Sequence, residues 1–310
     1  MVNSNLTKLA LYVLSIAAAP AQAINVVQSN DDGWAEINIR QQYYSLTDAG
    51  FNSFISAPAV DRSGTGSSDA PPTTVGSNGC EFGSCPAGSP AVGKNESMPR
   101  FNYVNSYPVT AMRYGIQHLA STFFGNGIKP DIAVSGFNVG ANLGVVTQFS
   151  GTVGAACEAV RLGVPAIAFS GSTGTQTAWN ASVEGYVQTY ATLATTVTRY
   201  LTAGEKPYLP RNVWLNVNFP PSNSTTCRVP LEYQFVLSRI HDAVPRITPS
   251  DVVTCNNKGR LPTETEVINT PGCYASISVG SADTKLDACA AEQEFVLGRL
   301  GVILGCLPSK

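Results

Sequence analysis

The regular alternation of short apolar runs with longer helical segments is the feature that most constrains how this sequence can fold. Each apolar run has the length of a single strand. Such runs are typical of parallel strands that are buried on both faces and joined by helical crossovers. The sequence therefore predicts an α/β fold with a doubly wound, mostly parallel sheet and helices on both faces. The expected strands are residues 24–29, 51–57, 131–135, 165–169 and 213–219, and the expected helices are 34–49, 109–124, 152–162 and 180–203.

Two stretches break this alternation. Residues 64–99 are rich in Gly, Ser, Pro and Thr, and we expect an inserted surface loop pinned by a local disulfide between Cys80 and Cys85. Residues 220–290 carry four cysteines among many Pro, Asn and Thr residues, so we expect an irregular, disulfide-containing C-terminal extension. Both stretches belong to one predicted domain that spans residues 24–310.

The amino terminus has the features of a secretory signal peptide. An apolar run over residues 9–19 follows Lys8, and Ala21 and Ala23 are small residues at the positions that a signal peptidase reads. The run is too short for a bilayer, which needs about 20 apolar residues. A buried first strand or helix is the alternative. We predict a signal peptide over residues 1–23 and a secreted mature protein.

The cysteines support the same compartment. Eight cysteines follow the predicted signal, and an even number in an exported chain indicates disulfides whose connectivity the sequence does not reveal. Cys157 lies in an apolar helical setting and is expected to be packed rather than reactive. Three Asn-x-Ser/Thr sequons, at Asn95, Asn180 and Asn223, fit an exported glycoprotein.

Composition argues against several functional classes. Only 13% of residues are charged and the formal net charge is −2, so the chain lacks the broad basic surface that a nucleic acid polymer requires. No later segment has the length and hydropathy of a membrane span, so no membrane partner is expected. The absence of a Gly-x-Ser-x-Gly motif argues against a serine hydrolase. A small phosphorylated molecule, such as a single nucleotide, is compatible with this charge.

The strongest chemical signal is the pair Asp31-Asp32, which lies where the first predicted strand meets the first predicted helix. Ligands of open α/β sheets bind at this end of the strands. Adjacent carboxylates in a tight turn repel each other unless a cation lies between them, and hard oxygen ligands suit Mg²⁺, Mn²⁺ or Ca²⁺. The alternative is a structural turn that caps the helix, with its acids favoured by the helix dipole.

Three further clusters follow a predicted strand or open a predicted helix. They are Asp61–Gly64, Ser135–Gly144 and Ser150–Gly154. The glycines of the second cluster allow close backbone approach, and its asparagines supply neutral oxygens. The third cluster can bind phosphate through free N–H groups, although plain capping by Ser150 or Thr152 is the alternative. Because all four clusters fall at one edge of the predicted sheet, a shared site explains them better than independent turns.

These clusters, in this order, resemble the signature blocks of the SurE family of survival-protein phosphatases. Four blocks carry the resemblance: Asn30–Gly33, Asp61–Gly64, Ser135–Gly144 and Ser150–Val153. The similarity covers residues 24–240, and the signal and cysteines make the chain similar to secreted, fungal-type SurE-like acid phosphatases. The block Ser106–Ala111 departs from the family's Gly-Thr-Pro-x-Asp-Cys pattern. This departure leaves substrate preference and oligomeric state open, a homodimer included.

The resemblance implies a divalent metal site beside a phosphate site, with Mg²⁺ or Mn²⁺ as the expected ion. The implied metal ligands are Asp31, Asp32, Ser63 and Asn138, and the expected phosphate-binding residues are Asn142, Ser150, Gly151 and Thr152. Family members remove phosphate from nucleoside monophosphates and other phosphate monoesters. Asp31 and Asp32 are therefore the expected catalytic residues, in a hydrolysis where metal-activated water attacks phosphorus.

Two rival functions stay open on the sequence alone. An aspartyl-phosphate enzyme would use Asp31 as its nucleophile, although that chemistry usually needs a D-x-D spacing and a lysine partner. A non-catalytic, secreted phosphoester- or metal-binding protein would keep the site without turnover.

Overall fold

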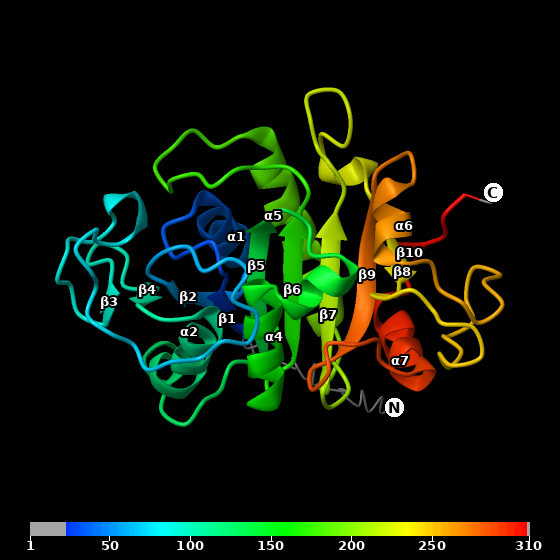
Figure 1. The fold of residues 1–310 in the computed structure, drawn as a ribbon, viewed down its shortest axis with the longest axis horizontal. Helices are drawn as coiled ribbons and strands as arrows, with labels where there is room; N and C mark the ends of the chain where they lie inside the picture. Colours follow the sequence, from blue (N-terminus) through cyan, green and yellow to red (C-terminus); the bar gives the residue numbers. More distant parts are fainter. Residues whose placement is uncertain (1–22, 309–310) are drawn as a thin grey trace, which may run out of the picture.

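The computed structural model describes residues 23–308, which form a ten-stranded, mostly parallel sheet with helices on both faces (Figure 1). The strand order is β10-β8-β9-β7-β6-β5-β1-β2-β4-β3, and only the β3–β4 and β7–β9 pairs are antiparallel. The strands are β1 (Asn25–Ser29), β2 (Asn52–Pro58), β3 (Val92–Lys94), β4 (Phe101–Val104), β5 (Ile132–Val139), β6 (Ala166–Gly171), β7 (Val213–Phe219), β8 (Gln234–Ser238), β9 (Tyr274–Ser281) and β10 (Leu304–Gly305).

The order of the central strands creates a switch point between β1 and β5. From β1 the chain builds outward through β2 and β4, and it then returns to add β5, β6 and β7 on the other side of β1. The connections that follow β1 and β5 therefore run in opposite directions along the sheet. In open α/β sheets, the crevice that this leaves at the carboxyl ends of the strands is the usual place for a ligand.

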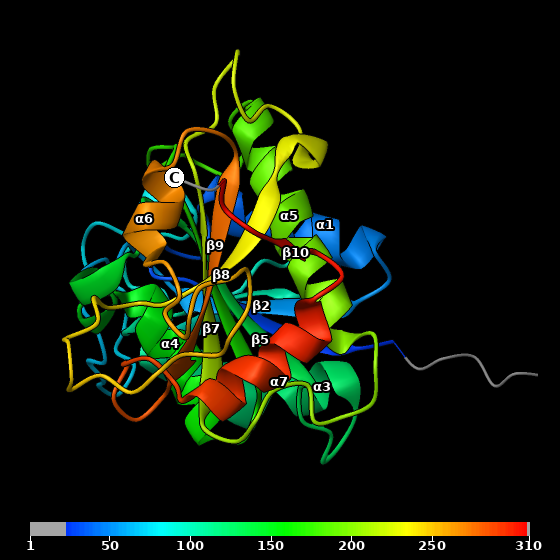
Figure 2. The same ribbon diagram turned by 90° about the vertical axis from the view of Figure 1, so that its right-hand side faces the viewer.

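Helices cover both faces of the sheet. They are α1 (Ile37–Asp48), α2 (Pro108–Tyr114), α3 (Ala120–Phe124), α4 (Gly151–Arg161), α5 (Gly185–Thr202), α6 (Glu264–Asn269) and α7 (Ala290–Leu300). Figure 1 shows α4 in front of the sheet and α5 behind it, and Figure 2 places α4 on one side and α1 and α5 on the other.

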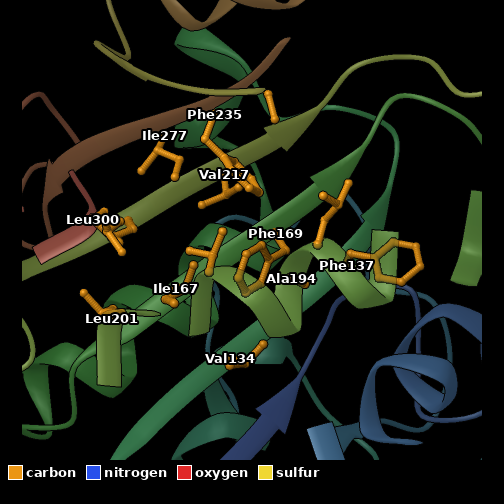
Figure 3. Close-up of a cluster of buried hydrophobic side chains, with 14 of the residues drawn as sticks. Val134, Phe137, Ile167, Phe169, Ala194, Leu201, Val217, Phe235, Ile277 and Leu300 are labelled. Carbon is orange, nitrogen blue, oxygen red and sulfur yellow. The ribbon is translucent and has the colours of Figure 1, made fainter. Parts of the chain in front are cut away.

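Successive strand residues enter two different cores, which explains the unbroken apolar runs in the sequence. Val26 of β1 packs in the cluster shared with α1, α5 and α7, and Val27 packs in the cluster beneath α2 and α4. Both side chains are fully buried. Figure 3 shows the first cluster, where Val134, Ile167 and Val217 of adjacent strands face Ala194 of α5. A strand that is covered on both faces has no solvent-exposed face, so its sequence shows no alternation of polar and apolar residues.

The predicted fold class is confirmed, with local differences. The expected helix over residues 109–124 is interrupted by a π-turn at Gly115–Leu119, between α2 and α3. A Cβ at Gly115 would lie 2.8 Å from Ser56 Cβ and 2.9 Å from Val27 Cγ2, so this glycine lets the helix pack directly on the sheet. The segment 64–99 is mostly loop, with the short strand β3, and the Cys80–Cys85 disulfide is confirmed.

The C-terminal extension is disulfide-containing, as expected, but residues 220–290 are not irregular throughout. They hold β8, α6 and β9, which the sequence analysis did not predict, and β9 pairs with both β7 and β8 inside the sheet. Buried serines hide these strands from a search for apolar runs. The hydroxyls of Ser238 and Ser278 form a hydrogen bond of 2.7 Å across the β8–β9 pair. The domain boundaries at residues 24 and 310 stay a prediction.

Three disulfides join Cys80 to Cys85, Cys227 to Cys273, and Cys255 to Cys306. Cys157 is a free, buried thiol, as expected, and Cys289 is a free, exposed one. The signal peptide predicted over residues 1–23 lies outside the described residues, apart from Ala23. In the described part of the chain, no helix combines the length and the apolar character needed to cross a membrane.

Candidate active site

The first two chain segments of the site meet at the switch point. Ser29 of β1 is in register with Ser135 of β5, so the turn after β1 lies beside the end of β5. The Asn30 side chain closes that turn, because its amide donates to Gly33 O at 2.9 Å and its Oδ1 accepts from Gly33 N at 3.2 Å. The turn is therefore held without the carboxylates of Asp31 and Asp32, which are free for other contacts.

Asp31 lies against the amino terminus of α4. Its Oδ1 accepts a hydrogen bond of 2.5 Å from the hydroxyl of Thr152, and the same hydroxyl lies 3.2 Å from Asn138 Oδ1. Gly151 is required by this approach, since a Cβ there would lie 2.8 Å from Asp31 Cβ. The structure thus brings Asp31, Asn138 and Thr152 together from three separate segments.

Asp32 is the more deeply held carboxylate. Its Oδ2 accepts from Val139 N at 3.0 Å, and its Oδ1 accepts from Gln176 Nε2 at 2.6 Å. Gln176 lies in the loop between β6 and α5, and no local pattern in the sequence marks it. Only the topology, which brings that loop to the same sheet edge, reveals the contact.

The two carboxyl groups are buried without a positively charged partner among the described residues. Asp31 and Asp32 are 2% and 0% exposed. Burial raises the pKa of Asp31, and for Asp32 burial and then repulsion from Asp31 and Glu36 raise the pKa well above its usual range. Within residues 23–308, neither carboxylate forms an ion pair with a Lys or Arg side chain. A bound cation would supply the missing positive charge.

The donor set at this edge favours a hard cation. The described residues contain no cluster of three or more His, Cys, Asp or Glu side chains arranged to hold a metal. What they offer instead is the carboxylates of Asp31 and Asp32 with the amide oxygen of Asn138. All-oxygen sets of this kind suit Mg²⁺ or Mn²⁺ rather than Zn²⁺.

Ser63, the fourth expected ligand, lies in the block next to the site, and its hydroxyl is bonded to Asp61. The backbone N–H of Arg62 donates to Asp31 O at 2.7 Å, which docks the Asp61–Gly64 block on the turn. The Ser63 hydroxyl, however, donates to Asp61 Oδ1 at 2.7 Å and the residue is exposed.

Of the expected phosphate-binding residues, Asn142 and Ser150 lie on the connection from β5 to α4, and Gly151 and Thr152 open α4. Ser150 caps α4, because its Oγ accepts from Val153 N at 3.1 Å, and its own hydroxyl hydrogen is still free to donate. Asn142 is fixed through Ser170, whose Oγ accepts from its amide at 2.9 Å, and through Asn218 and Asn216, which bond its backbone. The hydroxyl of Thr152 donates to Asp31 and is therefore not free to bind phosphate.

Two acidic residues that sequence reasoning missed also support this edge. Glu264 of α6 accepts from Gly144 N at 3.2 Å and from Asn216 Nδ2 at 2.6 Å, and burial raises its pKa to about 8. Glu81, in the 64–99 loop, accepts from Ala35 N at 2.9 Å, just beyond the Asp31–Gly33 turn. Its position next to Cys80 was the only sequence signal, since a disulfide fixes the loop that carries it.

The sequence of this chain matches the family model described as "Survival protein SurE" over residues 26–237. The chain belongs to the SurE family. The matched range contains Asp31, Asp32, Asn138 and Thr152, whereas β9 of the sheet lies beyond it.

The chain is similar to an acid phosphatase of Yarrowia lipolytica and to bacterial 5'-nucleotidases. An acid phosphatase of Yarrowia lipolytica is 37% identical over 298 residues, which cover 87% of this chain and 83% of that protein. The 5'-nucleotidase SurE of Maridesulfovibrio salexigens is 34% identical over 149 residues, 47% of this chain and 51% of that one. The match to this bacterial relative thus spans about half of its length. The crystal structure of the SurE protein from Aquifex aeolicus shares the fold, with a TM-score of 0.58, 20% identity, and coverage of 84% of this chain and 94% of that chain.

A large cavity elsewhere in this SurE-family chain is not the site. It has a volume of about 1080 Å³ and is lined by the starts of β1, β6 and β7, at the amino-terminal edge of the sheet. The carboxylate there, Asp131, is already paired with Lys206. The uncompensated charge lies at the opposite edge, where Asp31 and Asp32 meet α4.

Proposed function

We propose that this chain hydrolyses phosphate monoesters, nucleoside monophosphates among them, with a divalent cation held at the Asp31–Asp32 turn. The observation that carries the proposal is this buried pair, which no Lys or Arg of residues 23–308 neutralises and which faces the amino terminus of α4. The activities that name its relatives, acid phosphatase and 5'-nucleotidase, support the same phosphoric monoester hydrolase class.

The residues present fit a divalent cation. Asp31 Oδ1 and Asn138 Oδ1 approach the same Thr152 hydroxyl, so oxygens from the turn after β1 and from β5 converge there, with Asp32 next in the chain. We assign the metal to Asp31, Asp32 and Asn138. Ser63 joins them only if its hydroxyl rotates away from Asp61, a small change for an exposed serine.

The mechanism follows from these positions. A divalent cation held by Asp31, Asp32 and Asn138 would supply Lewis-acid chemistry, which polarises phosphoryl oxygens and makes water a stronger nucleophile. Asp31 and Asp32 would orient the attacking water and accept its proton. The water oxygen would bond to phosphorus as the ester P–O bond breaks, and the released proton would pass to the leaving oxygen. The N–H groups at the start of α4 hold the non-bridging oxygens, together with the free hydrogens of Ser150 and Asn142. Thr152 acts through Asp31, which its hydroxyl orients.

The test is phosphate release from a panel of monoesters and nucleotides before and after removal of divalent metal. We expect a chelator to abolish release and Mg²⁺ or Mn²⁺ to restore it. Full turnover in a verified metal-free preparation would instead favour Asp31 as a covalent nucleophile, which rapid quench with labelled substrate detects as a phosphoenzyme. Metal or nucleotide binding without any release would leave only the non-catalytic rival.

We also infer that the protein works outside the cytosol. Disulfides persist in oxidising compartments, and residues 23–308 contain three, two of which bridge segments 46 and 51 residues apart between Cys227 and Cys306. The inference agrees with the signal peptide predicted over residues 1–23. Amino-terminal sequencing of the exported protein tests it, with Ile24 as the expected first residue.

A further inference from the structure

The loop closed by the Cys80–Cys85 disulfide lies on the turn that follows the two aspartates. Glu81 Oε1 accepts from Ala35 N at 2.9 Å, and Ser84 Oγ accepts from Trp34 Nε1 at 2.9 Å. Two residues of a six-residue ring, Cys80 to Cys85, thus hold two consecutive residues beyond Gly33. The ring is closed a second time by a backbone hydrogen bond of 2.9 Å from Cys80 N to Cys85 O.

The Glu81 carboxylate fills the space beside the turn where a side chain would otherwise lie. Gly33 has φ +113°, and a Cβ on it would lie 2.0 Å from Glu81 Oε1 and 2.1 Å from Oε2. The carboxylate therefore packs flat on the backbone next to Asp32. The loop itself is anchored to the sheet, because Glu81 N donates to Ala59 O, just past β2, at 3.1 Å.

The Asn30 side chain and Arg62 N hold the first part of the turn, and Glu81 and Ser84 hold the residues that follow Gly33. Asp31 and Asp32 repel each other in a buried setting, so the chain must hold their backbone in place before a cation arrives. A turn that is fixed in advance avoids an ordering cost when the ion binds. Removing a residue that positions a metal ligand commonly changes metal affinity by about 10- to 100-fold.

We propose that Glu81 is a positioning residue for the metal site, and that the Cys80–Cys85 loop holds it against the Gly33–Ala35 backbone. The inference rests on the proposed metal-dependent hydrolysis. Glu81 contacts neither metal nor substrate; it keeps the turn in the conformation that aims Asp31 and Asp32. Because the acceptor oxygen is what holds Ala35 N, the shape of the Glu81 side chain matters here more than its charge.

The experiment compares Glu81→Ala with Glu81→Gln in the full-length protein. Mn²⁺ binding is measured by calorimetry, hydrolysis over a range of Mn²⁺ concentrations, and amide hydrogen exchange in a peptide that covers residues 33–36. We expect Glu81→Ala to weaken Mn²⁺ binding about 10-fold or more and to speed exchange at Ala35, with kcat recovering at saturating Mn²⁺. Glu81→Gln keeps an acceptor oxygen and should remain within about threefold of the unmodified protein. Unchanged Mn²⁺ affinity and unchanged exchange in Glu81→Ala would overturn the proposal.

Disulfide variants supply the matched control. The double variant Cys80→Ser/Cys85→Ser should shift Mn²⁺ affinity in the same direction as Glu81→Ala, whereas Cys255→Ser/Cys306→Ser, far from the turn, should not. If both disulfide variants lose affinity equally, the loop has no special role. If Glu81→Ala does not fold, Ser84→Ala removes the neighbouring contact alone and must still speed exchange near Trp34. If the unmodified protein hydrolyses esters without metal, the proposed function fails, while the exchange experiment still decides whether Glu81 holds the turn.

Discussion

At the scale of single residues, Asp32 offers a way to separate charge from shape. Asp32→Asn removes one of two buried, mutually repelling charges and keeps the size of the side chain. Its oxygen can still accept from Val139 N, and the Gln176 amide can turn its own oxygen toward the new NH₂ group. We expect turnover to fall by at least about 100-fold, whereas the thermal stability of the metal-free protein at neutral pH stays the same or rises. Steady-state kinetics and calorimetry of the same preparations measure both.

A variant that keeps its activity and binds Mn²⁺ as tightly as the unmodified protein would show that the Asp31–Asp32 turn is structural. A variant that loses both activity and metal-free stability would mean that Asp32 is required for folding, and the charge argument would then have to rest on Asp31.

Thr152 tests the link between α4 and the metal site. Its hydroxyl donates to Asp31 Oδ1, and hydrogen bonds to charged groups contribute about 1.5–3 kcal/mol. Thr152→Val should therefore lower kcat/KM by about 10- to 150-fold. Because the contact is to Asp31, we also expect weaker Mn²⁺ binding, which a purely phosphate-binding threonine would not show. Thr152→Ser keeps the hydroxyl and serves as the control.

The residues that sequence alone located are those with a local signal. Asp31 follows the apolar strand β1, and Asn138 lies near the end of β5 between two glycines, so the order of the strands is enough to place them together. Gln176 and Glu264 have no such signal, because they reach the site through contacts 144 and 120 residues apart in the chain. Ser63 shows the opposite case, since its motif is local and yet its hydroxyl faces Asp61.

At the scale of elements, apolar content decided which strands could be predicted. β1, β5, β6 and β7 were predicted within a few residues because both of their faces are covered by helices. β8 and β9 were missed because part of their buried surface consists of paired serines, which apolar periodicity does not detect. Each of these two strands is buried only when it pairs with the other, and a search along the sequence does not detect such tertiary contacts.

The short helix α6 brings a buried acid to the active-site loop and so introduces a pH dependence. Burial raises the pKa of Glu264 from 4.5 to about 8. A carboxyl with a raised pKa in the folded state stabilises the fold fully at pH values below its unfolded pKa. That contribution is lost as pH rises from about 4.5 to about 8, because the folded protein must then bury a charge.

As pH rises from 5 to 8, we therefore expect the free energy of unfolding to fall less in Glu264→Gln than in the unmodified protein. One pKa unit corresponds to about 1.4 kcal/mol, and about 1 kcal/mol moves the Tm of a domain of roughly this size by about 2–4 °C. Differential scanning calorimetry of both metal-free proteins across this range gives the comparison. Parallel curves for the two would show that Glu264 does not titrate within the fold. The pKa of Glu36 is also raised to about 8. Its contribution to the pH dependence of stability is the same in both proteins, so it cancels in their difference.

At the scale of the whole molecule, the disulfides divide into two kinds with opposite expected effects. The Cys227–Cys273 and Cys255–Cys306 bridges close loops of 46 and 51 residues in the C-terminal part of the chain. The Cys80–Cys85 bridge spans only 5. Long loops gain more from closure than short ones, and bridges of this class typically contribute about 2–4 kcal/mol.

The last prediction follows from that division. Removing Cys227–Cys273 or Cys255–Cys306 by paired serine substitution should lower Tm by about 5 °C or more, while leaving the Mn²⁺ affinity of the folded protein unchanged. Removing Cys80–Cys85 should lower Tm less, because its loop is short, yet it should weaken Mn²⁺ binding, because the loop holds the turn beside Asp32. Calorimetry of unfolding and of Mn²⁺ binding on the three double variants gives both rankings. If the two rankings coincide, metal affinity simply follows global stability, and the short bridge has no separate link to the active site.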